Sequence, residues 1–326
     1  MSGGVDDVDF GRLSFGAASL GNLYKEISDE QAYATLQAAW DEGIRSFDTA
    51  PHYGLGLSER RIGAFLATKP RDEFVLSTKV GRLLVPNPDP RGAELLDTDG
   101  FIVPADVVRR FDPSEEGIRR SLEESLQRLG LDRVDILYLH DPDVYDLDRG
   151  LREGLPALAA VRDEGLVRGV GVGVNSAEVA ARAVREGDLD VVLIAGRYTL
   201  LNQTAAADLL PVAVERGVRI VNGAPYNSGI LAAETVPDDA HYDYGRVPAE
   251  VLDKARRIQA VCAEFGVSLP AAALRFAARG PQVATVLVGM GSASRVRENV
   301  ARMAADIPEE LWAALAERGL TSTSVG

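Results

Sequence analysis

Cysteine and histidine are scarce in this sequence, which has one cysteine, Cys262, and three histidines, at positions 52, 140 and 241. A single cysteine forms no disulfide within the chain, which suits a reducing compartment. Cys-x-x-Cys and His-x-x-x-His are both missing, so we expect no zinc-type metal site. Cys262 lies in an apolar run of helical character, and we expect it to be a small core residue.

Long apolar stretches and an excess of basic residues are missing too. No apolar run reaches the roughly 18 to 20 residues that a bilayer requires, and no basic segment precedes an apolar one at the N-terminus. We therefore expect a cytoplasmic protein. Lys and Arg total 35 against 49 Asp and Glu, a net charge of −14. Nucleic acids and anionic membranes favour basic surfaces, so neither is an expected partner.

Strand-like and helix-like segments alternate along all 326 residues. Short apolar runs predict strands at 13–16, 45–48, 74–79, 134–139, 167–172, 191–195, 218–222 and 283–288. Apolar spacing and capping residues predict helices at 29–42, 58–66, 114–129, 151–164, 177–186, 205–215, 249–264, 269–278, 294–303 and 308–318. Eight strand–helix units predict an α/β fold, a closed (β/α)₈ TIM barrel that forms a single domain over 1–326.

Two connections, at 81–113 and 225–248, are much longer than the others. Structureless loops beyond about 15 residues are uncommon and usually act as lids or binding loops. Each of these connections follows a predicted strand. We therefore expect two long loops over the C-terminal face of the barrel.

Polar residues stand at or just past the ends of three predicted strands. Asp48 ends the second strand, Lys79 ends the third and His140 follows the fourth, while Tyr53 comes five residues after Asp48. The active sites of (β/α)₈ barrels lie at the C-terminal ends of the strands, so we expect these side chains to meet. Each one alone fits a structural role, such as a rim tyrosine or half of an ion pair. Together they predict a proton-transfer site.

Tyr53 is the expected proton carrier of this site. A phenol has an ordinary pKa of about 10 and exchanges protons poorly at neutral pH. A neighbouring ammonium, here Lys79, lowers that pKa by favouring the phenolate, and Asp48 holds the ammonium in place. His140 is then suited to orient a carbonyl or hydroxyl group of the substrate.

A dinucleotide-binding fingerprint is missing from the chain. Residues 54–59 and 171–176 are glycine-containing look-alikes, but neither opens a βαβ unit with the full Gly-x-Gly-x-x-Gly pattern. A Rossmann fold is therefore not supported.

The contexts of Asp48, Tyr53, Lys79 and His140 resemble those of the catalytic tetrad of the aldo-keto reductase family, and the resemblance covers nearly the entire chain. It implies an NAD(P)-dependent oxidoreductase whose cofactor lies extended across the barrel mouth. The segment 295–299 is similar to the family's Arg-x-x-Glu-Asn motif. Arg295 would then stack on the adenine, and Glu298 and Asn299 would hydrogen-bond its edge.

The same resemblance implies further cofactor contacts. The residues concerned are Gly16, Ala17, Asp48, Asn175, Gly223 and Gly289. Several places depart from the family pattern: Gly173-Val174 and Ala195 replace residues that hold the carboxamide, and Gly223 stands where an aromatic stacks on nicotinamide. Gly289-Met290 replaces a Lys-Ser pair that binds the 2′-phosphate in many NADP-preferring relatives. NAD is therefore the expected cofactor, with NADP possible through Arg295 or Arg297.

Motifs at 21–24, 50–59, 140–143 and 196–201 resemble the aldose dehydrogenase branch, which includes L-fucose and D-threo-aldose 1-dehydrogenases, and the similar pyridoxal 4-dehydrogenase. The resemblance implies oxidation of a sugar at C1 to a lactone, with a small sugar or aldehyde as substrate. The candidate substrate contacts, each equally compatible with simple rim structure, are Tyr24, Asp141, Tyr226 and Asn227. Pyridoxal oxidation, general aldehyde or ketone reduction and a regulatory NAD(P)-binding subunit with little turnover are the alternatives. The sequence predicts no oligomeric state.

Overall fold

The computed structural model describes residues 4–89, 91–243 and 245–322. The barrel strands are β1 (Leu13–Gly16), β2 (Ser46–Asp48), β3 (Val75–Val80), β6 (Ile136–His140), β7 (Gly169–Val174), β8 (Val191–Ala195), β9 (Arg219–Gly223) and β12 (Val283–Gly289). Within the described residues, these eight parallel strands close into a barrel in the order β1-β12-β9-β8-β7-β6-β3-β2. The predicted (β/α)₈ barrel is therefore confirmed.

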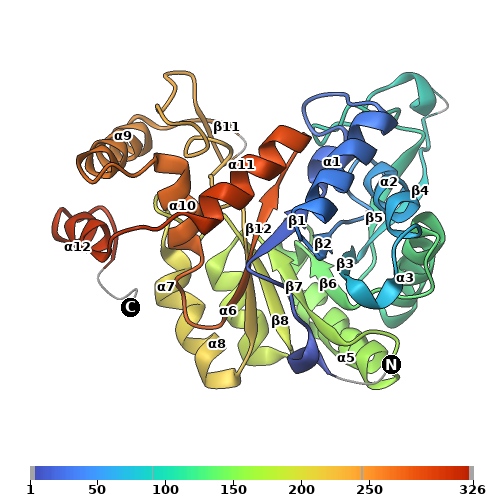
Figure 1. Ribbon diagram of the computed structural model, residues 1–326. Helices are drawn as coiled ribbons and strands as arrows, with labels where there is room; N and C mark the ends of the chain where they lie inside the picture. Colours follow the sequence, from blue (N-terminus) through green and yellow to red (C-terminus); the bar gives the residue numbers. More distant parts are fainter. Residues whose placement is uncertain (1–3, 90, 244, 323–326) are drawn as a thin grey trace.

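Helices surround the barrel (Figure 1). They are α1 (Asp29–Asp41), α2 (Leu57–Leu66), α3 (Glu115–Leu129), α4 (Leu147–Arg149), α5 (Leu155–Asp163), α6 (Ala177–Glu186), α7 (Thr204–Asp208), α8 (Leu210–Arg216), α9 (Ala249–Glu264), α10 (Leu269–Ala277), α11 (Ala293–Ala304) and α12 (Glu309–Glu317). Short 3₁₀ segments lie at η1 (Val5–Asp7), η2 (Ala18–Gly21), η3 (Arg71–Glu73), η4 (Gly92–Glu94) and η5 (Pro142–Val144), and a π-helical turn at η6 (Gly150–Gly154).

Most predicted elements agree with the structure to within one or two residues, and two predicted helices differ more. The predicted helix at 205–215 is divided into α7 and α8, because Pro211 in the first turn of α8 has no N–H to continue the preceding helix. The predicted helix at 151–164 is only the last part of a segment that begins at α4 and contains the π turn. Strand β7 begins and ends two residues later than predicted, so its last residue is Val174 and Asn175 follows it directly.

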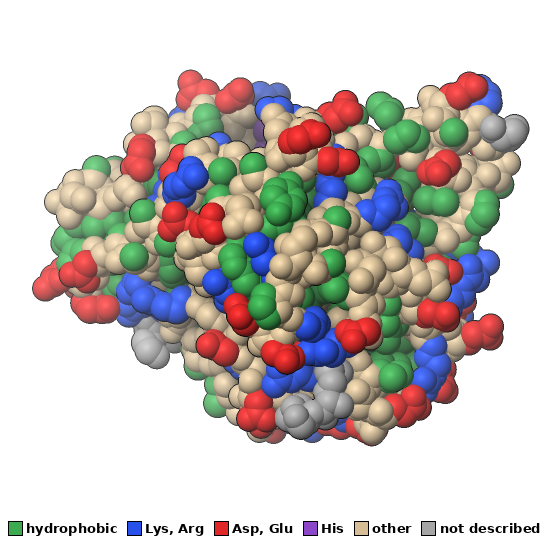
Figure 2. All heavy atoms as spheres, turned by 45° about the vertical axis from the view of Figure 1, so that its right-hand side comes forward, with side chains coloured by type: hydrophobic (Ala, Val, Ile, Leu, Met, Phe, Trp, Pro, Cys, Tyr) green, Lys and Arg blue, Asp and Glu red, His purple; other side chains and the backbone are tan. Residues whose placement is uncertain are grey.

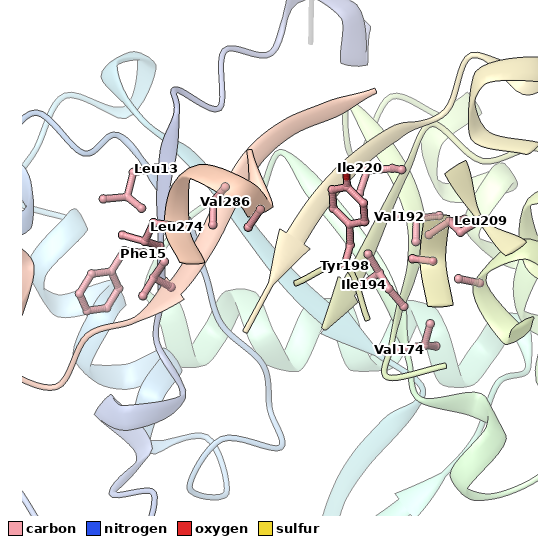
Figure 3. Packing of buried hydrophobic residues seen from close by; sticks show 14 of the residues in the cluster. Leu13, Phe15, Val174, Val192, Ile194, Tyr198, Leu209, Ile220, Leu274 and Val286 are labelled. Atoms are coloured by element: carbon pink, nitrogen blue, oxygen red, sulfur yellow. The ribbon is translucent and has the colours of Figure 1, made fainter. Parts of the chain in front are cut away.

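Alternation along the strands divides the apolar residues between two clusters. Val192 and Ile194 of β8 pack outward with the helices, whereas Val191 and Leu193 point to the barrel interior with Tyr138 of β6. Figure 3 shows part of the outer cluster, in which side chains from β1 and β12 meet Leu274 of α10. Because side chains of a strand alternate between its two faces, every second residue of β3 and β6 must also point inward.

The sequence predicts two long loops, but each of these connections contains strands. The first contains an antiparallel hairpin, β4 (Arg82–Pro86) with β5 (Val107–Phe111), and the second a short one, β10 (His241–Tyr242) with β11 (Gly245–Arg246). The strands of the first hairpin are separated by 87–106, so no short turn motif announces it in the sequence. Both connections rise toward the top of the view in Figure 1, over the C-terminal ends of the strands.

The surface carries both signs of charge. On the face drawn in Figure 2, Lys and Arg side chains are interspersed with Asp and Glu, and the described residues there form no extended basic patch. Within the described part of the chain, no individual helix combines the length and apolar character needed to cross a bilayer; α9 and α10 reach both only as a pair bent by 101°.

Candidate active site

Strand periodicity brings three members of the predicted tetrad into the barrel interior. Lys79 is two residues beyond Ser77 on β3, and His140 is two residues beyond the inward-pointing Tyr138 on β6. Asp48 ends the neighbouring strand β2, where it is paired in register with Ser77. Tyr53 comes from the loop between β2 and α2. The sequence-predicted residues therefore converge at the C-terminal ends of β2, β3 and β6.

Lys79 is the centre of this arrangement. Its Nζ donates to Asp48 Oδ2 at 2.5 Å, to the Thr49 carbonyl at 2.9 Å and to the Tyr53 hydroxyl at 3.0 Å. An ammonium has three N–H donors, so all of them are used. Asp48 Oδ1 accepts a hydrogen bond from Ser77 Oγ at 2.7 Å. Lys79 is only 1% exposed, and its position is therefore fixed by contacts on every side.

Two glycines set the position of Tyr53. Gly54 has a φ of +62°, and a Cβ built there would lie 2.3 Å from the Gly21 carbonyl oxygen. A Cβ on Gly21 would in turn lie 2.6 Å from the Tyr53 carbonyl carbon. The loops after β1 and β2 thus approach backbone to backbone, a contact that only glycine permits. Phe101, from the first long connection, covers the Tyr53 ring at a centroid distance of 6.1 Å.

A buried ion pair anchors α2 behind the tetrad. Glu59 is fully buried, accepts from Thr78 Oγ1 at 2.8 Å through Oε1, and binds Arg128 Nε at 2.5 Å through Oε2. Thr78 points outward on β3, opposite in direction to its neighbour Lys79. Ser58 Oγ also donates to the Ala17 carbonyl at 2.8 Å. These contacts tie the helix that follows Tyr53 to β3 and to the end of β1.

The tetrad contains one ion pair and two neutral groups at neutral pH. Burial raises the pKa of Tyr53, and the Lys79 ammonium opposes that rise without reversing it. The expected lowering of the Tyr53 pKa by Lys79 is therefore only a partial effect. Burial lowers the pKa of Lys79, but Asp48 and Tyr53 outweigh it and the net pKa is raised. Burial, followed by Arg82 and Lys79, holds the pKa of His140 well below its usual value.

Two arginines beside the tetrad were missed by sequence reasoning, although Asp141, the partner of one of them, is a predicted substrate contact. Arg82 Nη2 donates to Asp141 Oδ2 at 2.7 Å, and its Nη1 lies 3.3 Å from His52 Nδ1. Arg109 donates to both carboxylate oxygens of Asp97, at 2.6 and 2.8 Å. Both arginines belong to the first hairpin, and their partners are distant in sequence. The one available signal was an arginine directly after Gly81, at the point where β3 ends.

A cavity of about 720 Å³ occupies the opposite arc of the barrel mouth. It lies beyond the ends of β7, β8, β9 and β12, whereas the tetrad lies beyond β2, β3 and β6. The predicted site residues that line it are Tyr24, Asn175, Tyr226, Asn227, Gly289, Arg295 and Asn299. Gly16, Ala17, Gly223, Glu298 and Asp141 are not among its lining residues within the described chain.

Two of the lining amides already have partners. Tyr226 donates its hydroxyl to Asn299 Oδ1 at 2.7 Å, and Arg302 Nη1 approaches the same oxygen at 3.3 Å. Asn227 is buried, with Oδ1 accepting from Thr199 at 2.6 Å and Nδ2 donating to the Gly196 carbonyl at 3.1 Å. Asn227 therefore stabilises the loop after β9, and its predicted substrate contact stays a prediction.

The cavity suits the nicotinamide dinucleotide that the sequence predicts. A Cβ on Gly289 would meet no atom within 4 Å, so the cavity is open at the place where phosphate-binding relatives carry lysine. Arg295, which also lines the cavity, is exposed in the first turn of α11. The half-buried Asn175 lines the cavity after β7, the strand next to the one that carries His140. Met290 is fully buried in the core and faces away from the ligand space. Among the described residues, no group of three or more His, Cys, Asp or Glu is placed to hold a metal ion.

Fold and site together define a class of barrel oxidoreductase, and comparison with known proteins identifies it. The family model for the aldo/keto reductases matches residues 12–318. The chain therefore belongs to the aldo/keto reductase family, and it is an oxidoreductase that uses a nicotinamide cofactor.

Individual relatives narrow the comparison. The chain is 51% identical to D-threo-aldose 1-dehydrogenase from a Pseudomonas species, over 95% of this chain and 94% of the relative. It is 39% identical to pyridoxal 4-dehydrogenase from Microbacterium luteolum, with the same coverage. A solved aldo-keto reductase from Bacillus halodurans superposes with a TM-score of 0.75 at 24% identity, covering 100% of this chain and 97% of that one, and supports the fold.

Proposed function

We propose that this enzyme is an aldose 1-dehydrogenase that oxidises a cyclic sugar at C1 to a lactone, with Tyr53 as the general base. The observation that carries the proposal is the contact of one buried ammonium, Lys79, with both the Tyr53 phenol and the Asp48 carboxylate. The 51% identity to a D-threo-aldose 1-dehydrogenase supports the substrate class.

Tyr53, Lys79 and His140 each have a distinct role in the proposed reaction. When bound, a nicotinamide dinucleotide would supply the hydride acceptor. Tyr53 takes the proton of the anomeric hydroxyl as C1 loses its hydride, so that a C1 carbonyl forms and the O–H and C–H bonds break. Tyr53 must be a phenolate to do so, and Lys79 at 3.0 Å stabilises that charge. His140, kept neutral, hydrogen-bonds the anomeric oxygen and orients it.

In the reverse direction the same groups reduce an aldehyde, with Tyr53 donating its proton. The raised pKa of Tyr53 keeps it protonated at neutral pH, which suits reduction. Oxidation requires the phenolate and is therefore favoured at alkaline pH. The proposed cofactor for oxidation is NAD, because Gly289 provides neither a cation nor a hydroxyl for a 2′-phosphate.

The test is a spectrophotometric panel at the absorbance of reduced nicotinamide. L-fucose, D-arabinose, pyridoxal and several simple aldehydes are each supplied with NAD or NADP, or with the reduced cofactors for the aldehydes. Oxidation of an aldose with the highest kcat/KM supports the proposal. A higher kcat/KM for pyridoxal favours pyridoxal 4-dehydrogenase, the activity named for the relative at 39% identity. Cofactor binding without turnover of any substrate would indicate a regulatory NAD(P)-binding protein.

A further inference from the structure

Four polar side chains form a closed group beside the tetrad, beyond the ends of β2, β3 and β6. Asp141 Oδ2 lies 3.4 Å from His140 Nε2 and 2.7 Å from Arg82 Nη2, and Arg82 Nη1 lies 3.3 Å from His52 Nδ1. The group closes because the His52 ring stands edge-on to the His140 ring, with centroids 5.4 Å apart. His52 and Arg82 have no role in the proton transfer described above, although His52 packs against Tyr53 and His140 and Arg82 contacts His52 and Asp141.

The contact with Arg82 decides which nitrogen of His52 carries the proton. A guanidinium only donates, so Nδ1 must accept, and a neutral imidazole then has its proton on Nε2. Asp99, the other neighbour of Nδ1, is 3.8 Å away, which is too far for a hydrogen bond. Burial, with Arg82 and Arg109, lowers the pKa of His52 to about 2, so the ring is neutral. Among the described residues, His52 Nε2 has no hydrogen-bond acceptor.

Asp141 provides the complementary acceptor. Its Oδ2 accepts a hydrogen bond from Arg82 and lies 3.4 Å from His140 Nε2, whereas no hydrogen bond reaches Oδ1 from the described residues. Its backbone has a φ of +39°, in the left-handed region that a residue with a side chain rarely adopts. Such strain persists only where surrounding contacts impose it, and it is concentrated at functional sites. Here it turns a carboxylate at the end of β6 toward His140.

We propose that His52 and Asp141 form a donor–acceptor pair that binds a substrate hydroxyl next to the reacting carbon, with Arg82 as the residue that positions both. The inference rests on the proposed aldose oxidation and adds how the site selects hydroxylated substrates. The His52 ring is 6.0 Å from the Tyr53 ring and 5.4 Å from the His140 ring, so it borders the space in which a molecule held between Tyr53 and His140 would lie. A substrate without that hydroxyl leaves the pair without a partner and is therefore disfavoured.

The first test compares glyceraldehyde with propanal, which has the same carbon chain without hydroxyls, as substrates for reduction. We expect the wild-type enzyme to prefer glyceraldehyde in kcat/KM. His52→Phe keeps a ring against Phe101, which packs edge-on to His52 at 5.3 Å, but removes the donor. We expect it to lower the glyceraldehyde-to-propanal ratio about tenfold, the size typical of a lost neutral hydrogen bond or two. His52→Gln retains an N–H donor and should restore part of the ratio.

Asp141→Asn tests the acceptor, because the single amide oxygen would face the Arg82 donor and leave an NH₂ group where the substrate hydroxyl should donate. Asp132→Asn is the control, because the Asp132 side chain is 82% exposed and Asp132 is not among the charges that act on Asp141. The ratio should fall in Asp141→Asn and stay at the wild-type value in Asp132→Asn. Equal loss for both aldehydes in His52→Phe and Asp141→Asn would overturn the inference. Failure of the wild-type enzyme to oxidise any aldose would instead overturn the proposed function, so the two failures are distinguishable.

Nitrogen-15 spectra of the imidazoles test the positioning role of Arg82. The chain has only three histidines, so the loss of signals in His52→Phe assigns the His52 pair. We expect His52 to be neutral, with the proton on Nε2, in the wild-type holoenzyme. Arg82→Met should produce a mixture of the two tautomers and lower the selectivity ratio. A proton on Nδ1 in the wild-type enzyme would contradict the proposed donor.

Discussion

The Nζ atom of Lys79 lies 3.0 Å from the Tyr53 hydroxyl and 2.5 Å from Asp48 Oδ2, so one buried ammonium separates the phenol from the carboxylate. This order has a physical consequence. The Asp48 carboxylate raises the pKa of Tyr53, whereas Lys79 lowers it, and burial raises it most of all. The proton affinity of Tyr53 is thus a balance between burial and one cation, and it is sensitive to that cation.

Tyr53→Phe should abolish turnover while cofactor binding is retained. Loss of a positioned acid–base group typically costs about a hundredfold to ten-thousandfold in rate. Phenylalanine preserves the ring that packs near Phe101, so the fold should be unaffected. Steady-state kinetics give kcat, and fluorescence of the reduced nicotinamide gives cofactor affinity. A variant with a third of the wild-type kcat would show that Tyr53 is not the proton carrier.

In the pH profile for oxidation, kcat/KM rises at alkaline pH, and we call this rise the alkaline limb. Lys79→Met should move the alkaline limb to higher pH and lower the maximum kcat/KM. Oxidation needs the phenolate, so kcat/KM rises with pH until Tyr53 is deprotonated. Removing the ammonium leaves burial unopposed and raises the pKa of Tyr53 further. The measurement is kcat/KM for an aldose across the alkaline range. An active variant with an unshifted limb would refute the coupling.

Asp48→Asn provides a contrast of opposite sign. The sequence alone suggests a weaker change in the same direction as Lys79→Met, because Asp48 positions the ammonium. In the structure the Asp48 carboxylate itself raises the pKa of Tyr53, so a neutral amide should move the limb to lower pH. The maximum kcat/KM should still fall, since the amide holds Lys79 less firmly. A shift of the limb to higher pH would mean that positioning outweighs the direct charge effect.

The tetrad could be predicted from the sequence because strand ends and a two-residue period place Asp48, Lys79 and His140 without knowledge of distant contacts. The hairpin β4–β5 could not, since its strands are held apart by a long segment and pair only in three dimensions. Arg82 lies on that hairpin, so its contacts with His52 and Asp141 were missed for the same reason. The net pKa of Tyr53 was also beyond the sequence, because the degree of burial depends on Phe101 and on the packing of the loops around it.

Glu59→Gln should destabilise the fold strongly although Glu59 contacts no ligand. Its carboxylate is fully buried between Thr78 and Arg128, and Arg128 has only 16% of its side chain exposed. Breaking a buried pair leaves an uncompensated charge, which costs about 3–5 kcal/mol in the free energy of unfolding. Urea unfolding at neutral pH measures this cost. Glu164→Gln, which breaks the exposed pair with Arg119, is the control and should leave the midpoint nearly unchanged. Equal effects in the two variants would contradict the expected dependence on burial.

Cofactor choice depends on the cavity edge at Gly289. We expect kcat/KM with NAD to be at least equal to that with NADP, because no cation or hydroxyl is available at this position for a 2′-phosphate. Each charged hydrogen bond to a phosphate is worth roughly 1.5 to 3 kcal/mol, about tenfold to a hundredfold in affinity. Gly289→Lys should therefore raise the efficiency with NADP and leave NAD nearly untouched, since a side chain there enters open space. The variant keeps Met290, because its fully buried side chain belongs to the core and a serine there would not reach the cofactor.

Arg295 is the residue that decides the outcome if the wild-type enzyme prefers NADP. It lines the cavity, whereas Arg297 on the same helix does not and lies 4.0 Å from Glu42. A tenfold preference for NADP would contradict the interpretation of Gly289 and make Arg295 the phosphate ligand. Arg295→Ala then separates two roles: loss with NADP alone indicates a phosphate contact, and equal loss with both cofactors indicates stacking on the adenine. Arg297→Ala should change neither, because its guanidinium lies outside the cavity.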